Sequence, residues 1–91
     1  MTRPEALALL ASAGEVTYDD LADIFQAFGF RSEFEAPNVD VYYHPQFIDC
    51  GVFRAKEYLG GVLSPGQRGL VRYMLHCVAL QEDRQQRRRR P

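Results

Sequence analysis

Few side chains of this 91-residue chain could do acid-base or nucleophilic chemistry near neutral pH. It has two histidines, His44 and His76, and two cysteines, Cys50 and Cys77. Histidine is the side chain whose ordinary pKa lies close to 7, and a thiolate is a nucleophile. His76 and Cys77 are neighbours in a predicted helix, where adjacent side chains point about 100 degrees apart. They therefore do not form a pair of general base and nucleophile.

The two cysteines are also too few and too far apart in the sequence for a metal site, and each belongs to an apolar stripe. We expect two buried thiols, with a disulfide and a reactive cysteine as the less favoured alternatives. The sequence predicts no metal and no other cofactor.

His44 follows two tyrosines in the run Val41-Tyr42-Tyr43-His44-Pro45. Tyr43 is expected to face the core beside Val41, which leaves Tyr42 as the exposed ring. For His44, a place at the end of a turn, fixed by a backbone hydrogen bond, is favoured over a catalytic or RNA-contacting role.

A helix is predicted ahead of this run, over residues 17–28. Thr17 is a good N-cap, and Gly29 supplies a left-handed stop. Phe30 can then contact Phe25, as in a Schellman motif. The apolar face repeats at helical spacing and consists of Leu21, Ile24, Phe25 and Phe28.

Residues 30–53 change to a period of two, which predicts three strands. The first covers 30–36, the turn Pro37-Asn38 leads into the second at 39–44, and the third runs from 47 to 53. Short turns cannot join parallel strands, so the sheet is an antiparallel meander. Alternation places Phe30, Ser32, Phe34 and Ala36 on the core side of the first strand, and Ile48, Cys50 and Val52 on one face of the third.

Two further helices complete the pattern. Ser64 caps a helix that should end near Gln81, after a loop signalled by Gly60-Gly61. A helix over residues 4–13, capped by Thr2, either packs on the core or contacts a partner.

The predicted fold class is α+β: helix, three-stranded antiparallel meander and helix, with an extra N-terminal helix. We divide the chain into a helical extension at 1–14, an α-β-β-β-α domain at 15–82 and a disordered, arginine-rich tail at 83–91. No apolar run reaches the roughly 18 residues that a membrane span needs, and no signal peptide is visible. We therefore expect a cytoplasmic protein without a membrane partner.

Charge is unevenly distributed along the chain. Residues 84–91 carry a formal charge of +5, so residues 1–83 carry −6 and the whole chain −1. An acidic body disfavours a protein that holds nucleic acid mainly by neutralising phosphates. The arginine tail is interpreted in two ways, as an electrostatic arm for RNA or as a disordered, solubilising end.

Three segments, in their order and spacing, resemble the HicA family of small toxins. They are LADIFQAFGF at 21–30, VYYHP at 41–45 and GQRGLVRYML at 66–75. The resemblance covers about residues 17–81. It implies a fold related to double-stranded-RNA-binding domains, cleavage of messenger RNA without a metal, and inhibition by a HicB antitoxin.

One departure from the family motif bears directly on catalysis. The motif begins the second strand with Gly-[Ser/Gly]-His, followed by an aromatic residue and His-Pro; here these are Tyr42 and His44-Pro45, and the histidine position falls on Val39. Valine cannot move a proton, and loss of a positioned general base costs about 10² to 10⁴ in rate. Asp40 is a weak base at neutral pH, and His44 is expected about 17 Å from Val39 on the opposite face.

Two functions follow from the resemblance. The favoured one is a catalytically impaired relative of the HicA messenger-RNA interferases that acts by binding a protein or RNA; the alternative is an active toxin ribonuclease with a rearranged active site. The partners considered are a HicB-like antitoxin or another protein, RNA, and a second copy of the chain. Arg54 and Lys56 are interpreted first as a solvated strand end. The candidate RNA- or partner-binding residues are Tyr42, His44, Arg54, Lys56, Arg87, Arg88, Arg89 and Arg90.

Overall fold

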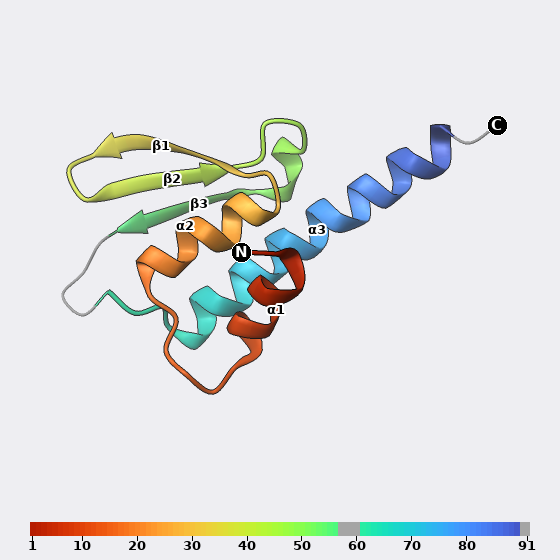
Figure 1. Cartoon of the computed structure of the whole chain (residues 1–91). Helices are drawn as coiled ribbons and strands as arrows, with labels where there is room; N and C mark the ends of the chain where they lie inside the picture. The colour runs from red at the N-terminus through yellow and green to blue at the C-terminus, as the bar shows by residue number, and fades with distance from the viewer. Residues whose placement is uncertain (57–60, 90–91) are drawn as a thin grey trace.

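The structure is a computed structural model that describes residues 1–56 and 61–89. It is an α+β fold in which helices cover one face of an antiparallel sheet of strand order β1-β2-β3 (Figure 1). The predicted fold class and meander are therefore confirmed. The elements are α1 (Arg3–Ala11), α2 (Tyr18–Ala27), β1 (Arg31–Ala36), β2 (Val39–Tyr43), the 3-10 turn η1 (Ile48–Cys50), β3 (Val52–Lys56) and α3 (Pro65–Arg89).

Both ends of α2 follow the local sequence signals. Thr17 forms a reciprocal capping box with Asp20, with N···O distances of 3.0 and 3.2 Å. At the other end Gly29 has φ of 82°, and the N–H of Phe30 donates to the Phe25 carbonyl at 3.1 Å. The two phenylalanine rings lie 4.7 Å apart, which confirms the predicted Schellman cap.

The sheet packs on α2 through Phe25, whose side chain is fully buried. The ring of Tyr42 stacks on Phe25 at 4.8 Å, and that of Phe53 lies 5.8 Å away. Tyr43 faces the other side of the sheet, where its hydroxyl donates to Glu33 at 2.9 Å. The prediction that Tyr43 is inward and Tyr42 exposed was wrong, because both faces of β2 carry apolar residues and packing on Phe25 selects between them.

The first strand has little cover on its core side. Phe30 is buried, but Ser32 is exposed and Phe34 is 75% exposed. Because β1 is an edge strand, it has a neighbouring strand on one side only, and the core face predicted for Ser32 and Phe34 is left open.

The segment predicted as the start of the third strand is a turn instead. The N–H groups of Gln46 and Phe47 both donate to Nδ1 of His44, at 3.1 and 3.2 Å, and this holds the chain in a bend. η1 follows, and Gly51, with φ of 103°, leads into β3. The buried residues of β3 are Phe53 and Ala55, so the shared face expected for Ile48, Cys50 and Val52 is not formed.

The two cysteines form a disulfide, Cys50–Cys77, which corrects the prediction of two free buried thiols. It joins η1 to α3 and brings the two Cα atoms to 5.6 Å. The separation of 27 residues gave no sign of this proximity, which arises because η1 packs against α3.

Helix α3 begins as predicted but continues beyond its expected end near Gln81. Ser64 and Gln67 form a capping box, with N···O distances of 2.8 and 3.1 Å. Residues 83–89, expected to be disordered, continue the helix. They are good helix formers without a glycine or proline, and Arg87 pairs with Asp83 at 3.1 Å.

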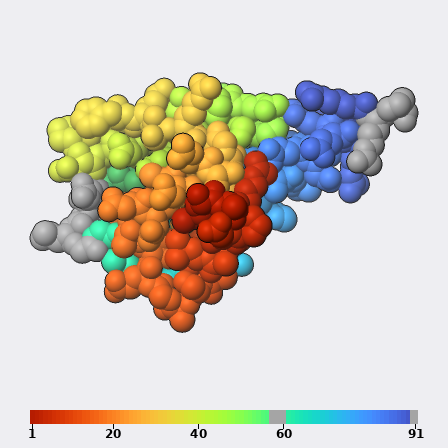
Figure 2. All heavy atoms as spheres, in the orientation of Figure 1, coloured from red at the N-terminus to blue at the C-terminus, as the bar shows by residue number. Residues whose placement is uncertain are grey.

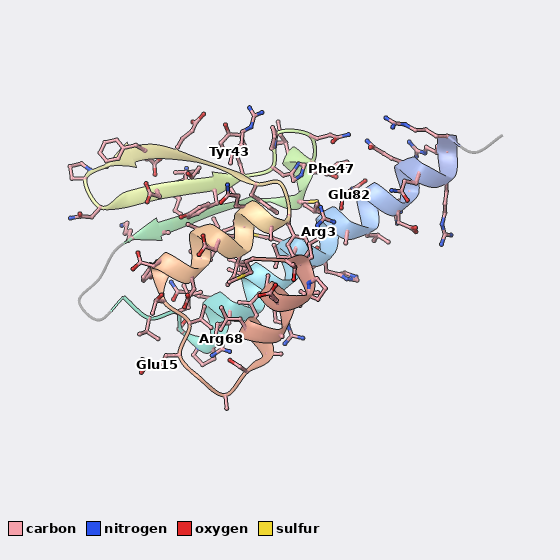
Figure 3. The ribbon with its side chains drawn as sticks, in the orientation of Figure 1. Arg3, Glu15, Tyr43, Phe47, Arg68 and Glu82 are labelled. Atoms are coloured by element: carbon pink, nitrogen blue, oxygen red, sulfur yellow. A yellow bond between two sulfur atoms is a disulfide. The ribbon has the colours of Figure 1, made fainter. Side chains whose placement is uncertain are left out.

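An ion pair ties α1 to the later part of α3 (Figure 3). Arg3 makes two hydrogen bonds to the carboxylate of Glu82, at 2.6 and 3.0 Å. The same guanidinium lies 4.7 Å from the centre of the Phe28 ring and donates to the Ala27 carbonyl. One side chain therefore links the start of α1, the end of α2 and α3.

A second arginine, Arg68, stabilises the C-terminal end of α1. The helix ends at Ala11 rather than at the predicted residue 13, and no basic residue lies in its last turn. Arg68 of α3 compensates, because a cation is favourable at a helix C-terminus. Its guanidinium donates at 2.7 to 3.2 Å to the carbonyl oxygens of Leu9, Leu10, Ser12 and Gly14.

Reduction of the disulfide should lower the free energy of unfolding by about 3 kcal/mol, because the bond restricts a long loop of the unfolded chain. Urea unfolding of the native chain with and without a reductant measures this difference. A Cys50→Ser/Cys77→Ser variant is the control, since its unfolding should not respond to reductant. Equal stability of the oxidised and reduced native chain would contradict the expectation.

Candidate functional site

Val39, the position to which the resemblance to HicA assigns a histidine, lies on the outer face of the sheet. Val39 pairs with Lys56, and its face is the one opposite to buried Tyr42 and Phe53. Neither histidine of the chain lies beside it: His44 follows the far end of β2 on the helix side, and His76 lies on α3. The sheet thus separates Val39 from both imidazoles.

His44 is a buried structural residue, 6% exposed. Its Nδ1 accepts the two N–H groups of the following turn, and its ring packs edge-on against Phe30 at 5.3 Å and beside Phe47 at 4.8 Å. The predicted turn-end histidine fixed by backbone hydrogen bonds is confirmed. Burial lowers the pKa of this imidazole, and the negative charge of Glu82 partly opposes that effect.

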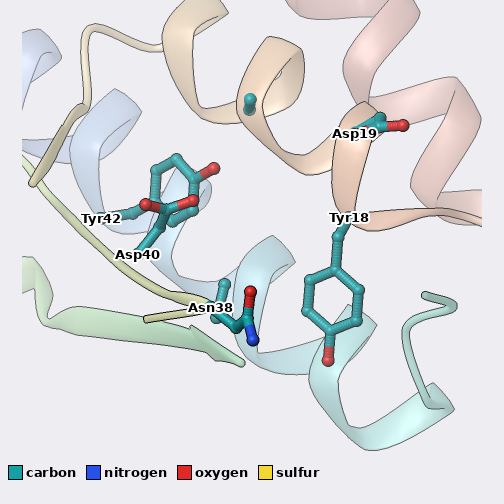
Figure 4. Close-up of a pocket in the computed structure, with 7 residues that line it drawn as sticks. Tyr18, Asp19, Asn38, Asp40 and Tyr42 are labelled. Carbon is teal, nitrogen blue, oxygen red and sulfur yellow. The ribbon is translucent and has the colours of Figure 1, made fainter. Parts of the chain in front are cut away.

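A hollow of about 230 Å³ opens between α2 and the tip of the β1–β2 hairpin (Figure 4). Burial, and then the negative charges of Asp40, Asp19 and Asp23, raise the pKa of the Tyr42 hydroxyl. An electronegative hollow repels phosphate and suits a cationic group. Its lining residues are Tyr18, Asp19, Ala22, Asn38, Asp40, Tyr42 and Ala55.

Sequence reasoning missed this hollow. The sequence analysis assigns no site role to Asp19 and treats Asp40 only as a weak base. Asp19 and Asp40 come together only because the β1–β2 hairpin folds back over α2. The negative charge of residues 1–83 was the one feature of the sequence that indicated an acidic site.

The candidate cations of β3 lie on the outer face of the sheet. Arg54 pairs with Glu35 across the sheet, with Nε 3.1 Å from a carboxylate oxygen, and Lys56 is exposed beside Val39. A phosphate-binding site would need a free guanidinium, but that of Arg54 is already paired with the Glu35 carboxylate.

The arginine cluster lies elsewhere, on the last turns of α3. This end of the helix projects away from the sheet and the other helices (Figure 1). Arg87 is paired with Asp83, whereas Arg88 and Arg89 are exposed; Arg90 lies outside the described residues. The seven predicted binding residues that the structure describes therefore do not form one surface.

A groove between α1 and α3 combines aromatic, apolar and basic side chains. It encloses about 410 Å³ and is lined by Leu7, Gly69, Arg72, Tyr73 and His76. Tyr73 is 68% exposed, and a Cβ added at Gly69 would meet no atom within 4 Å. The fold therefore has no steric need for a glycine inside this helix, where glycine costs about 1 kcal/mol relative to alanine.

Within residues 1–56 and 61–89, no three histidine, cysteine, aspartate or glutamate side chains gather in a way that could hold a metal ion. None of the helices in this part of the chain is long and apolar enough to span a membrane. Comparison of the chain with protein families, with curated proteins and with solved structures finds no match.

Stability should fall as the pH decreases from 7 to 5, because the folded state favours the neutral His44 ring. Its lowered folded pKa means that the unfolded chain, with an ordinary value of about 6.5, binds the proton more tightly in this range. Urea unfolding at several pH values measures the slope. A His44→Asn variant, whose amide oxygen can still accept from the turn, should have a shallower slope, and an equal slope in both chains would contradict this assignment.

Proposed function

We propose that this chain is a non-catalytic, HicA-like binding domain whose partner is a protein. The observation that carries the proposal is the environment of Val39. Metal-free cleavage of RNA through its 2′-hydroxyl needs a side chain that accepts a proton near neutral pH. At this position the chain has an aliphatic residue. Nδ1 of His44 lies elsewhere and already accepts hydrogen bonds from two backbone N–H groups.

The surroundings of the sheet also favour protein over RNA. Base stacking needs exposed aromatic rings, but Tyr42, the ring predicted for that role, is buried against Phe25. Phosphate contacts need free cations, but Arg54 is paired with Glu35. The hollow beside the hairpin carries the wrong sign of charge for a polyanion.

The groove between α1 and α3 is the surface that we assign to the partner. Exposed Leu7 and Tyr73 supply apolar and aromatic contact area, and the bare backbone at Gly69 allows close approach. Arg72 lines the groove, and Arg84 lies further along α3. This chemistry suits an amphipathic helix that has an apolar face and acidic flanks. A HicB-like antitoxin is one protein of this kind that the resemblance suggests.

RNA binding by the end of α3 is the second candidate, because Arg88 and Arg89 are exposed there on a projecting helix. Such binding would rest on charge alone and would weaken steeply with salt. An active ribonuclease remains the alternative reading of the resemblance, and it would need a proton acceptor from outside the Val39 position. The cytoplasmic location also remains a prediction, and a structural disulfide is more usual in an oxidising compartment.

The native chain should not cleave RNA in the presence of a chelator. Incubation with a mixed RNA substrate, beside a Val39→His variant, tests this. We expect cleavage to be gained by the variant, because the substitution supplies the missing base on an otherwise retained scaffold. Cleavage by the native chain would remove the non-catalytic proposal.

A photo-crosslinking amino acid at Tyr73 should capture a protein in cells that produce this chain. The same amino acid at Glu15, an exposed loop residue away from the groove, is the matched control. We expect a discrete adduct from position 73 that resists ribonuclease. An adduct that ribonuclease destroys, or equal capture from both positions, would contradict a protein partner in this groove.

A further inference from the structure

The outer edge of β1 is unprotected and lies beside an exposed aromatic side chain. In the described part of the chain no strand pairs with this edge. Phe34 projects from it with 75% of its surface exposed. In the space-filling view the yellow atoms of this hairpin form the upper rim of the molecule (Figure 2). Exposed strand edges readily accept another strand, and most proteins protect them.

A hollow opens further along the same strand, where Phe30 and Ser32 line it. It encloses about 380 Å³ between α2 and β1, which exceeds the roughly 150 Å³ of a cavity that holds benzene. Phe30, Ser32 and Phe34 share the helix side of the strand, because they are two residues apart. The hollow is lined by Ala22, Gln26, Phe30, Arg31, Ser32 and Tyr42.

We infer that β1 pairs with β1 of a second copy of this chain, antiparallel about a two-fold axis at Ser32, so that Phe34 of each copy enters the α2–β1 hollow of the other. In this register Phe34 lies opposite Phe30 of the second copy. Residues directly opposite one another in antiparallel strands share a face, so the ring is placed on the side where the hollow opens. The same contact, Phe34 of one copy in the α2–β1 hollow of the other, thus forms twice, as a two-fold interface requires.

The charged residues on the outer face of β1, Arg31 and Glu33, favour the same register. With Ser32 opposite Ser32, Arg31 of each copy faces Glu33 of the other, which gives two opposite-charge pairs. A shift in one direction places Glu33 opposite Glu33, and a shift in the other places Arg31 opposite Arg31. Like charges directly opposite are destabilising, so both shifted registers are disfavoured. The first of them would also place Arg31 opposite Glu35, but Glu35 lies at the irregularity of the strand, outside the segment that can pair.

The irregularity between Phe34 and Ala36 limits the length of the contact. Beyond it the strand no longer continues a regular ladder, so pairing is confined to about residues 30–34. The inference goes beyond the proposed function, since it concerns a different surface and does not require the α1–α3 groove.

Sedimentation equilibrium of the full chain tests the pairing. We expect a dimer for the native chain and a dissociation constant about tenfold to a hundredfold higher for Phe34→Ser, because a buried aromatic ring is lost from each half of the interface. Ile48→Ser is the matched control, since Ile48 is also highly exposed, at 71%, but lies on η1. A monomeric native chain, or a dimer unaffected by Phe34→Ser, would overturn the inference.

Charge exchange tests the register. Arg31→Glu should weaken the dimer by placing acidic residues opposite one another, and Arg31→Glu combined with Glu33→Arg should restore it. A double variant that associates no better than the single one, while its circular dichroism is unchanged, would overturn the register.

Crosslinking gives an independent measurement. Cysteine at Ser32 should form a disulfide between two copies, because directly opposite Cβ atoms lie about 5 Å apart. Cysteine at Glu35 should not, because the proposed register places the two copies of that residue about 20 Å apart along the strands. Equal crosslinking at both positions would overturn the proposed axis.

Discussion

The burial of Phe25 between α2 and the sheet is the contact on which the rest of the structure depends. Its ring touches Phe30, Tyr42 and Phe53, which come from the end of α2, from β2 and from β3. Once Tyr42 turns inward to stack on it, strand geometry turns Val39 outward. The inside and outside of the sheet, and hence the surroundings of the candidate site residues on β2 and β3, follow from this one packing choice.

Helix α3 provides the second constraint, because it connects parts of the chain that are distant in sequence. The disulfide joins it to η1, Glu82 joins it to Arg3, and Arg68 caps α1. Polar contacts continue along the helix, where Gln81 and Gln85 bind Asp49 and Gln46. These contacts hold the helix well past its last buried residue, Val78, and carry the arginine cluster away from the acidic body.

The function that we propose is based on the side chains that this packing leaves exposed on the surface. The outer face of the sheet presents Val39 with mixed charges, the hairpin hollow is acidic, and the most basic segment projects at the end of α3. An RNA-cleaving surface would require a base, free cations and exposed rings in one place. Here these elements are buried, paired or separated, while aromatic and apolar side chains remain accessible in the α1–α3 groove and on β1.

Local sequence was sufficient for features whose energetics are local. The capping residues Thr2, Thr17 and Ser64, the Schellman glycine and the turn at Pro37-Asn38 satisfy backbone groups within a few residues, so their patterns were interpreted correctly. The antiparallel order also followed from turn length alone. The absence of histidine from position 39 can be read from the sequence alone and needed no coordinates.

The remaining features depend on contacts between distant residues. The alternation in β2 allowed either face to be buried, and it is packing on Phe25 that buries the face carrying Tyr42. The proximity of Cys50 to Cys77 and the exposure of Phe34 likewise arise from how η1 and the strand edge are placed in space. Side-chain periodicity reports which residues share a face, but burial of that face is set by the element that packs against it.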